Sequence, residues 1–160
     1  MKIGLSYCTF KKRVKSDPTN YRPISRLSCV DKVFERIVFK HIYNFLLKNL
    51  LIYKYQSGFT IGHCTTHQLI EIYHNICLAL ENQNIICTVF CDISKGFDRV
   101  WHKGLIKKLK AYGLSENLIH WLENYIENRT QTVVIKNCFS EPGIIKGGVS
   151  QGSVLGPLLF

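Results

Sequence analysis

The segment Phe90-Cys91-Asp92-Ile93-Ser94-Lys95-Gly96-Phe97-Asp98-Arg99-Val100-Trp101-His102 is the part of the sequence that best indicates the fold. The apolar run at 85–92 leads into it after the polar residues Asn82-Gln83-Asn84. This run is too short for a helix and predicts a strand that is covered on both faces. Its last residue, Asp92, is a carboxylate, which costs free energy when buried unless it is hydrogen-bonded or meets a cation. Asp92 is therefore either a cap of the following turn or a metal ligand.

The spacing of apolar residues predicts the other elements around this strand. Apolar residues repeat at helical spacing over 30–46, 69–80, 105–112 and 118–126. Ser28, with Asp31 three residues later, resembles a capping box at the start of the first helix. β-branched residues at 130–135 indicate a further strand with a return through Ile144-Ile145, and the glycines at 147–153 indicate a loop. This order of elements predicts an α+β fold that forms one compact unit or a fragment of one.

The composition indicates a folded protein with an affinity for polyanions. The 21 Lys and Arg against 11 Asp and Glu give a formal net charge of +10, which favours nucleic acid or an anionic membrane as a partner. The seven cysteines include no Cys-x-x-Cys pair and indicate free thiols in a reducing compartment. No apolar run approaches the roughly 20 residues that span a bilayer. We therefore expect an intracellular protein, in the cytoplasm or nucleus, without a membrane partner.

A second candidate metal site lies around the start of the predicted helix at 69–80. His63, Cys64, His67, Glu71 and His74 are close in sequence and have side chains that can bind metals. Residues 67, 71 and 74 share one helical face, but that face lies opposite the apolar stripe of the helix. Solvated polar side chains are therefore the favoured interpretation of this group.

Segment 90–102 closely resembles the first catalytic motif of the reverse transcriptases of non-LTR retrotransposons. Three other segments resemble motifs of this family in the same order: Asn20-Tyr21-Arg22-Pro23-Ile24-Ser25, Gln56-Ser57-Gly58-Phe59 and Gly148-Val149-Ser150-Gln151-Gly152-Ser153-Val154-Leu155-Gly156-Pro157-Leu158-Leu159-Phe160. The likeness covers nearly the whole chain after about Thr9 and is strongest to the jockey-type elements of animals. It implies a partial right-hand polymerase, consisting of the fingers and the first part of the palm, over residues 17–160. Residues 1–16 would precede it as a basic, poorly ordered segment.

The resemblance implies a metal-binding, catalytic role for Asp92, which matches the first catalytic carboxylate of the family. Asp92 would ligate Mg²⁺ with the carbonyl oxygen of Ile93 as a second ligand, and such hard oxygen ligands suit this cation. In the family, two metal ions activate the primer 3′-hydroxyl and stabilise the leaving pyrophosphate. The second catalytic motif of the family, a paired Asp-Asp, is expected after Phe160.

The resemblance also implies a nucleotide-binding site and a surface for nucleic acid. The positions that match nucleotide contacts of the family are Ser94, Lys95, Gly96, Phe97, Gln151 and Gly152. Phe97 matches the ring that lies under the incoming sugar, and Gln151 with Gly152 matches a motif that contacts the nucleotide and the template. Lys11 and Arg22 match basic positions that face nucleic acid or the triphosphate.

The activity that the resemblance implies is the addition of deoxynucleotides to a DNA primer on an RNA template. Without the paired Asp-Asp, we expect the chain by itself to be inactive. Two departures from the family also put nucleotide binding in doubt, because Thr60 stands where it has arginine and Ser150 where it has proline. The alternative function is a non-catalytic, basic nucleic-acid-binding remnant of a mobile element. Salt-sensitive binding without nucleotide incorporation would support that alternative.

Overall fold

The computed structural model describes residues 3–10, 14–17, 20–136 and 138–160. The chain forms two compact units, one from Met1–Phe45 with Lys95–Phe160 and one from Leu46–Ser94. The predicted mixture of helices and strands is confirmed, with a single sheet, but the expectation of one compact unit is not. No helix within the described ranges is long and apolar enough to cross a membrane.

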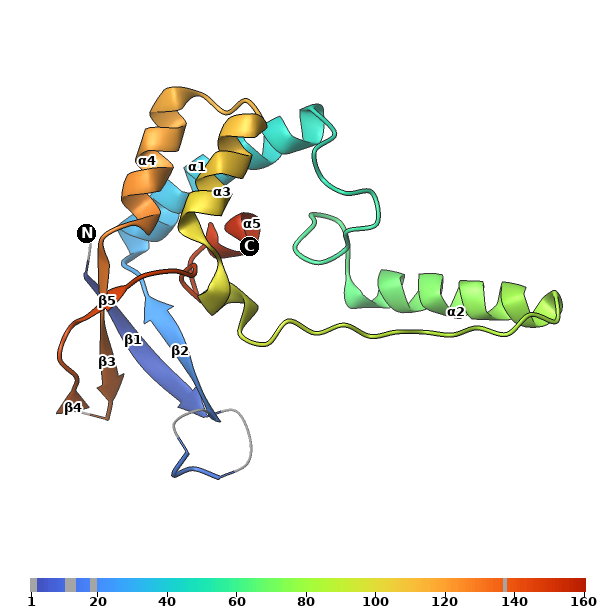
Figure 1. The fold of residues 1–160 in the computed structure, drawn as a ribbon, viewed down its shortest axis with the longest axis horizontal. Helices are drawn as coiled ribbons and strands as arrows, with labels where there is room; N and C mark the ends of the chain where they lie inside the picture. Colours follow the sequence, from blue (N-terminus) through green and yellow to red (C-terminus); the bar gives the residue numbers. More distant parts are fainter. Residues whose placement is uncertain (1–2, 11–13, 18–19, 137) are drawn as a thin grey trace. The chain divides into compact units, whose positions relative to one another are not determined.

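The first unit contains a five-stranded sheet with the strand order β2-β1-β3-β4, and β5 also pairs with β3 (Figure 1). The strands are β1 (Ile3–Phe10), β2 (Tyr21–Arg26), β3 (Arg129–Ile135), β4 (Cys138–Phe139) and β5 (Gly143–Ile145). β1 pairs antiparallel with β2 and parallel with β3. The strand predicted at 130–135 is β3, and the predicted return through Ile144-Ile145 is β5.

The start of the chain differs from the expected poorly ordered segment at 1–16, because Ile3–Phe10 forms β1. Leu5 and Tyr7 lie on one side of this strand, whereas Ser6 lies on the other side and is fully buried. The alternation has the period of two that a strand surface requires. The prediction missed it because Ser6 and Thr9 lower the apolar content of the segment.

Three helices supply most of the core of the first unit: α1 (Cys29–Lys48), α3 (His102–Ala111) and α4 (Glu116–Ile126). The largest fully buried apolar side chains are those of Ile42, Ile119, Leu122, Ile126 and Leu155. α1 begins as predicted, since the Ser28 hydroxyl accepts a hydrogen bond from the Asp31 N–H at 3.1 Å. A salt bridge of 3.1 Å between Lys110 and Glu123 connects α3 to α4.

Only part of the predicted apolar stripe of α1 is buried. Ile42 and Leu46 lie in the core, whereas Val30 and Phe34 are exposed. Val30 and Phe34 line a cavity of about 450 Å³, which residues of the sheet and of α4 also line. The first turns of α1 therefore leave apolar surface next to a cavity, although the Phe34 ring also contacts that of Trp121 on α4, with 5.4 Å between the ring centroids.

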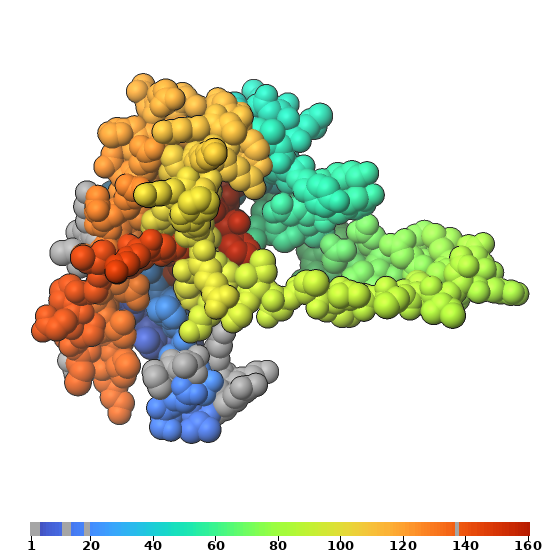
Figure 2. All heavy atoms as spheres, viewed as in Figure 1, coloured from blue at the N-terminus to red at the C-terminus, as the bar shows by residue number. Residues whose placement is uncertain are grey.

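The second unit contains α2 (Thr65–Glu81) and an extended segment after it. α2 buries none of its residues, although its apolar spacing predicts a side that faces a core. The covered strand predicted at 85–92 is absent: Figure 2 shows these residues as a thin ridge of atoms, and Ile85 is 98% and Phe90 85% exposed. A strand requires hydrogen bonds to a neighbouring strand. No described strand pairs with this segment, and the prediction was therefore wrong.

Candidate functional site

Asp92, Ile93 and Ser94 follow this extended segment and are exposed. A carboxylate and a carbonyl oxygen are ligands of the type that Mg²⁺ prefers. Within the described ranges, however, no group of three or more His, Cys, Asp or Glu side chains could hold a metal ion. The described side chains of the second candidate site at 63–74 do not form such a group either. The described residues thus offer suitable oxygen atoms at Asp92 without completing a metal site.

A short turn begins at Lys95, where the chain re-enters the first unit. Lys95 has a left-handed backbone with φ of 54° and precedes the 3-10 helix η2 (Gly96–Arg99). The carbonyl of Lys95 accepts a hydrogen bond from the Asp98 N–H at 3.0 Å. The turn places the Phe97 ring against that of Phe160, with 4.7 Å between the ring centroids and 16° between the planes. The ring that matches the sugar-contacting position is therefore held by an aromatic neighbour.

Hydrogen bonds join this turn to the glycine-rich loop. The Val149 N–H donates to the Phe97 carbonyl at 2.7 Å, and the Gly148 N–H donates to the Val100 carbonyl at 2.8 Å. The buried His102 donates from Nε2 to the Gly148 carbonyl, also at 2.7 Å. Two segments that are far apart in sequence are thus fastened together. His102 was within the quoted motif, but sequence reasoning gave it no role.

Two positions of the glycine-rich loop require glycine. Gly148 has φ of 82°, and a Cβ atom there would lie 2.8 Å from the Asp98 backbone. Gly152 has φ of 100°, and a Cβ atom there would lie 2.8 Å from the Ser25 carbonyl oxygen. Beside it, the Gln151 carbonyl accepts a hydrogen bond from the Ser25 N–H at 2.8 Å. The loop is therefore held closely against both the turn and β2.

A cavity of about 210 Å³ lies among β2, β3 and this loop. Its lining consists of Pro23, Ser25, Asp98, Arg129, Gln131, Ile145, Gly147, Gly148, Val149, Ser150 and Gln151. Gln151 therefore shares a cavity with two charged side chains, those of Asp98 and Arg129. Sequence reasoning did not identify Arg129, because an arginine at the start of a strand has no local pattern that distinguishes it from a solvated charge.

The predicted site residues lie in different parts of the structure. Phe97 is bonded to the loop that contains Gln151 and Gly152 through Val149, and these two loop residues lie against β2 at Ser25. Arg22 lies exposed on β2, and the two other residues of that strand that share its face are Ile24 and Arg26. Lys11 lies outside the described residues.

Glu35 on α1 is a buried residue of this region that sequence reasoning missed. Its side chain is 3% exposed, and its Oε1 accepts a hydrogen bond from the Tyr125 hydroxyl at 2.6 Å. Its Oε2 accepts hydrogen bonds from the Val154 N–H at 2.6 Å and the Leu155 N–H at 3.4 Å. Glu35 thus holds the segment directly after Gln151. The signal in the sequence was a carboxylate on the same helical face as Ile42.

Arg129 and Tyr125 extend this polar network at the side of the cavities. Arg129 lines both the cavity of about 210 Å³ and the larger one of about 450 Å³. Burial lowers the pKa of the Arg129 guanidinium, whereas Tyr125 and Glu35 raise it. Burial and the hydrogen bond to Glu35 raise the pKa of the Tyr125 hydroxyl above its ordinary value. The opposite charges of Arg129 and Glu35 offset part of the cost of burying each.

Comparisons with known proteins agree with the sequence motifs. A family model described as reverse transcriptase (RNA-dependent DNA polymerase) matches residues 11–160. A probable RNA-directed DNA polymerase from transposon X-element of Drosophila melanogaster is 38% identical over 160 residues, which cover 99% of this chain and 18% of that protein. One from transposon BS of the same species is 36% identical over 152 residues, with 91% and 16% covered. The RNA-directed DNA polymerase from mobile element jockey of Drosophila funebris is 38% identical over 144 residues, with 90% and 16% covered. The chain thus spans less than a fifth of the length of these relatives.

Proposed function

Because this chain belongs to the reverse transcriptase family, we propose that it forms part of the nucleotide-binding active site of an RNA-directed DNA polymerase from a non-LTR mobile element. One observation supports the proposal most strongly. The Val149 N–H donates a hydrogen bond of 2.7 Å to the Phe97 carbonyl, and this bond joins the motif at 90–102 to the glycine-rich motif at 148–160. A polymerase must hold the incoming nucleotide in a fixed orientation, and residues on both sides of a rigid junction can do so. The proposed substrate is a deoxynucleoside triphosphate, with an RNA template and a DNA primer as partners.

We assign residues 17–160 to the fingers and the first part of the palm of a right-hand polymerase. The single sheet with its packed helices supports this assignment at the level of fold class. Since β1 pairs with β2 and β3, the assignment also includes Ile3–Phe10.

The way in which each group is held supports the nucleotide-binding roles that we propose. Phe97 supports the incoming sugar with a ring that Phe160 keeps in place at 4.7 Å. Gln151 and Gly152 contact the nucleotide and the template, since their backbone is fixed to β2. The backbone of 94–96 approaches the triphosphate, and Lys11 with Arg22 supplies positive charge to phosphate groups.

The proposed metal is Mg²⁺, which in such polymerases activates the primer hydroxyl and stabilises the leaving pyrophosphate. Asp92 and the Ile93 carbonyl supply oxygen atoms that suit this cation. They do not make a complete metal site within the described residues. The resemblance places the other carboxylates of the site after Phe160, and we expect the 160 residues by themselves to be inactive.

The alternative function is a non-catalytic nucleic-acid-binding remnant. It is favoured by the net charge of +10 and by a sheet with three arginines, two in β2 and one in β3, and no acidic residue in any of its described strands. Such a protein would bind RNA or DNA in a salt-sensitive way without incorporating nucleotides.

Primer extension on an RNA template with Mg²⁺ tests the proposed function. The assay compares the 160-residue chain, a longer version that includes the downstream coding sequence, and Asp92→Ala in both. We expect incorporation only by the longer version and its loss in Asp92→Ala. Incorporation by the 160-residue chain would contradict the expected inactivity, and activity of the longer Asp92→Ala variant would contradict the role of Asp92. Inactivity of both lengths, with oligonucleotide binding retained, would support the alternative function.

A further inference from the structure

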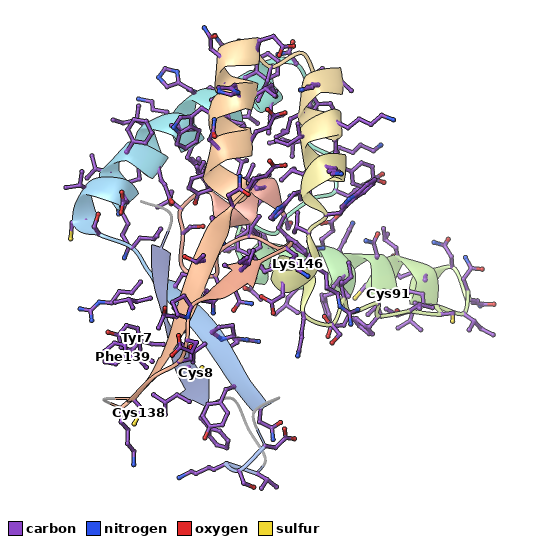
Figure 3. The ribbon with its side chains drawn as sticks, turned by 60° about the vertical axis from the view of Figure 1, so that its left-hand side comes forward. Tyr7, Cys8, Cys91, Cys138, Phe139 and Lys146 are labelled. Carbon is purple, nitrogen blue, oxygen red and sulfur yellow. The ribbon has the colours of Figure 1, made fainter. Side chains whose placement is uncertain are left out.

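His102, the first residue of α3, is 7% exposed and hydrogen-bonded to the glycine-rich loop. Its Nε2 lies 2.7 Å from the Gly148 carbonyl oxygen. Because a carbonyl oxygen only accepts, Nε2 carries the proton of this hydrogen bond. In Figure 3, Lys146 marks where the chain leaves β5 for the loop, close to the segment that leads into α3. The imidazole thus connects two residues that are 46 positions apart in sequence.

The first turn of α3 holds this imidazole in place. The ring of Trp101, the residue before His102, lies against Gly104, where a Cβ atom would clash with it. The Trp101 carbonyl accepts a hydrogen bond from the Leu105 N–H at 2.9 Å. The backbone on both sides of His102 is therefore fixed, and a donor on a rigid helix can fix the position of its acceptor.

One peptide group of the loop is held at both of its polar ends. Its carbonyl belongs to Gly148 and accepts from His102, whereas its N–H belongs to Val149 and donates to the Phe97 carbonyl at 2.7 Å. Gly148 and Val149 are both buried. The preceding peptide group is held as well, since the Gly148 N–H donates to the Val100 carbonyl at 2.8 Å. The orientation of the 148–149 peptide group therefore depends on a side chain from another element.

Gly148 allows this peptide group to rotate if the imidazole is removed. Glycine adopts backbone conformations that other residues avoid, and Gly148 already has φ of 82°. A buried carbonyl without a donor costs free energy, which favours a rotated peptide group whose carbonyl finds another partner. The hydrogen bond from His102 therefore selects one of the conformations that are open to the loop.

We propose that His102 is a positioning residue for nucleotide incorporation and that it acts on Gln151 through the 148–149 peptide group. Gln151 lies two residues beyond this peptide group, and its carbonyl accepts a hydrogen bond from the Ser25 N–H at 2.8 Å. Residues 148–151 are thus anchored at one end by α3 and the turn and at the other end by β2. Loss of the imidazole weakens the first anchor. The inference rests on the proposed function, in which Gln151 contacts the incoming deoxynucleotide.

Steady-state primer extension by the longer version, with the deoxynucleotide concentration varied, tests the inference. His102→Leu keeps a side chain of similar size and removes the donor. We expect the KM for the nucleotide to rise by about tenfold, the scale of one lost hydrogen bond, and kcat to change less. His102→Gln should restore most of the loss, because its amide Nε2 is a donor at the same number of bonds from Cα.

The matched control is Leu109→Ala, which changes another buried side chain of α3. Leu109 is 6% exposed and carries no polar group that could hold the loop. We expect this variant to lower the unfolding midpoint while the KM for the nucleotide stays close to that of the unsubstituted chain. The pair of variants separates a role of His102 in the loop from a general loss of stability.

Hydrogen–deuterium exchange of the 160-residue chain gives a second readout that needs no activity. The N–H groups of Gly148 and Val149 are hydrogen-bonded and buried, so they exchange when the loop opens. His102→Leu should speed the exchange of residues 147–151 relative to that of α4, whereas Leu109→Ala should not. His102→Gln should exchange like the unsubstituted chain.

Three results would overturn the inference. They are an unchanged KM in His102→Leu, an equal rise of KM in Leu109→Ala, and unchanged exchange at 147–151 in His102→Leu. Asp92→Ala should abolish incorporation without altering this exchange, so the two proposals fail separately. A longer version that incorporates no nucleotide would contradict the proposed function, and the exchange experiment would then decide whether His102 holds the loop.

Discussion

Residues 85–94 and 95–102 are adjacent in sequence and belong to one motif, yet they are held in different ways. The second part is fixed by contacts within the first unit, including the bonds from Phe97 to Val149 and from His102 to Gly148. The first part belongs to the second unit, is exposed and pairs with no described strand.

A turn and a strand need different contacts in order to form. A turn closes through hydrogen bonds between near neighbours and then needs only a few distant contacts, as at Lys95 and Asp98. A strand has no internal hydrogen bonds, so even a strongly apolar run such as 85–92 becomes a strand only beside a partner. Substitutions at the junction should therefore destabilise the chain, and substitutions in the extended segment should not.

The largest effect is expected from Glu35→Ala. It removes the acceptor of the Tyr125 hydroxyl and of the Val154 N–H, and leaves both donors without their buried partner. We expect the free energy of unfolding to fall by about 3 kcal/mol, measured by urea denaturation. Glu141→Ala, at an exposed loop position, is the control and should change stability little. A small effect of Glu35→Ala would mean that the loop after Gln151 is held by other contacts.

Gly148→Ala should have the next largest effect and acts directly on the junction. The substitution combines φ of 82° with a Cβ atom 2.8 Å from the Asp98 backbone. We expect a loss of about 2 kcal/mol in the free energy of unfolding. At Gly143 a Cβ atom would meet its nearest neighbour, the Gln131 carbonyl oxygen, at 3.9 Å, so Gly143→Ala is the matched control. Equal stability of the two variants would show that the turn and the loop are not closely joined.

A smaller effect is expected from pH, through Tyr125. Burial and Glu35 raise the pKa of its hydroxyl above the ordinary 10.0, so the unfolded chain releases this proton first as pH rises. The stability contributed by Tyr125 is therefore fully present below pH 10.0 and lost above it. Unfolding measured across this range should show a flatter decline in Tyr125→Phe, whereas Tyr55→Phe, at an exposed ring, should decline like the unsubstituted chain. An identical decline in the unsubstituted chain and both variants would mean that the Tyr125 hydroxyl does not depend on burial and on Glu35 as proposed.

Local sequence patterns account for some elements of this fold and not for others. Helices α3 and α4 and the strand β3 could be predicted, because their apolar and β-branched patterns are local. Glu35 could not be assigned a role, since its partners Tyr125 and Val154 lie 90 and 119 residues away in sequence. The spacing of residues likewise did not predict that Phe97 lies close to the glycine-rich loop. Only the family resemblance assigned both to one site. Local patterns do not predict which residues far apart in sequence will contact each other. This explains the missed contacts of Glu35 and Phe97 and the wrong prediction of a strand at 85–92.

The smallest effect is expected from Phe90→Ser in the extended segment. The ring of Phe90 is 85% exposed, so its removal takes little apolar area out of contact with the rest of the chain. We expect the free energy of unfolding to change by less than about 0.5 kcal/mol. Leu122→Ala, at a side chain with no exposed surface, should by contrast cost about 3 kcal/mol in the same urea titration. A loss at Phe90 comparable to that at Leu122 would mean that the segment is covered in solution, for example by self-association. Repeating the titration at several protein concentrations separates these cases, because stability gained from association rises with concentration.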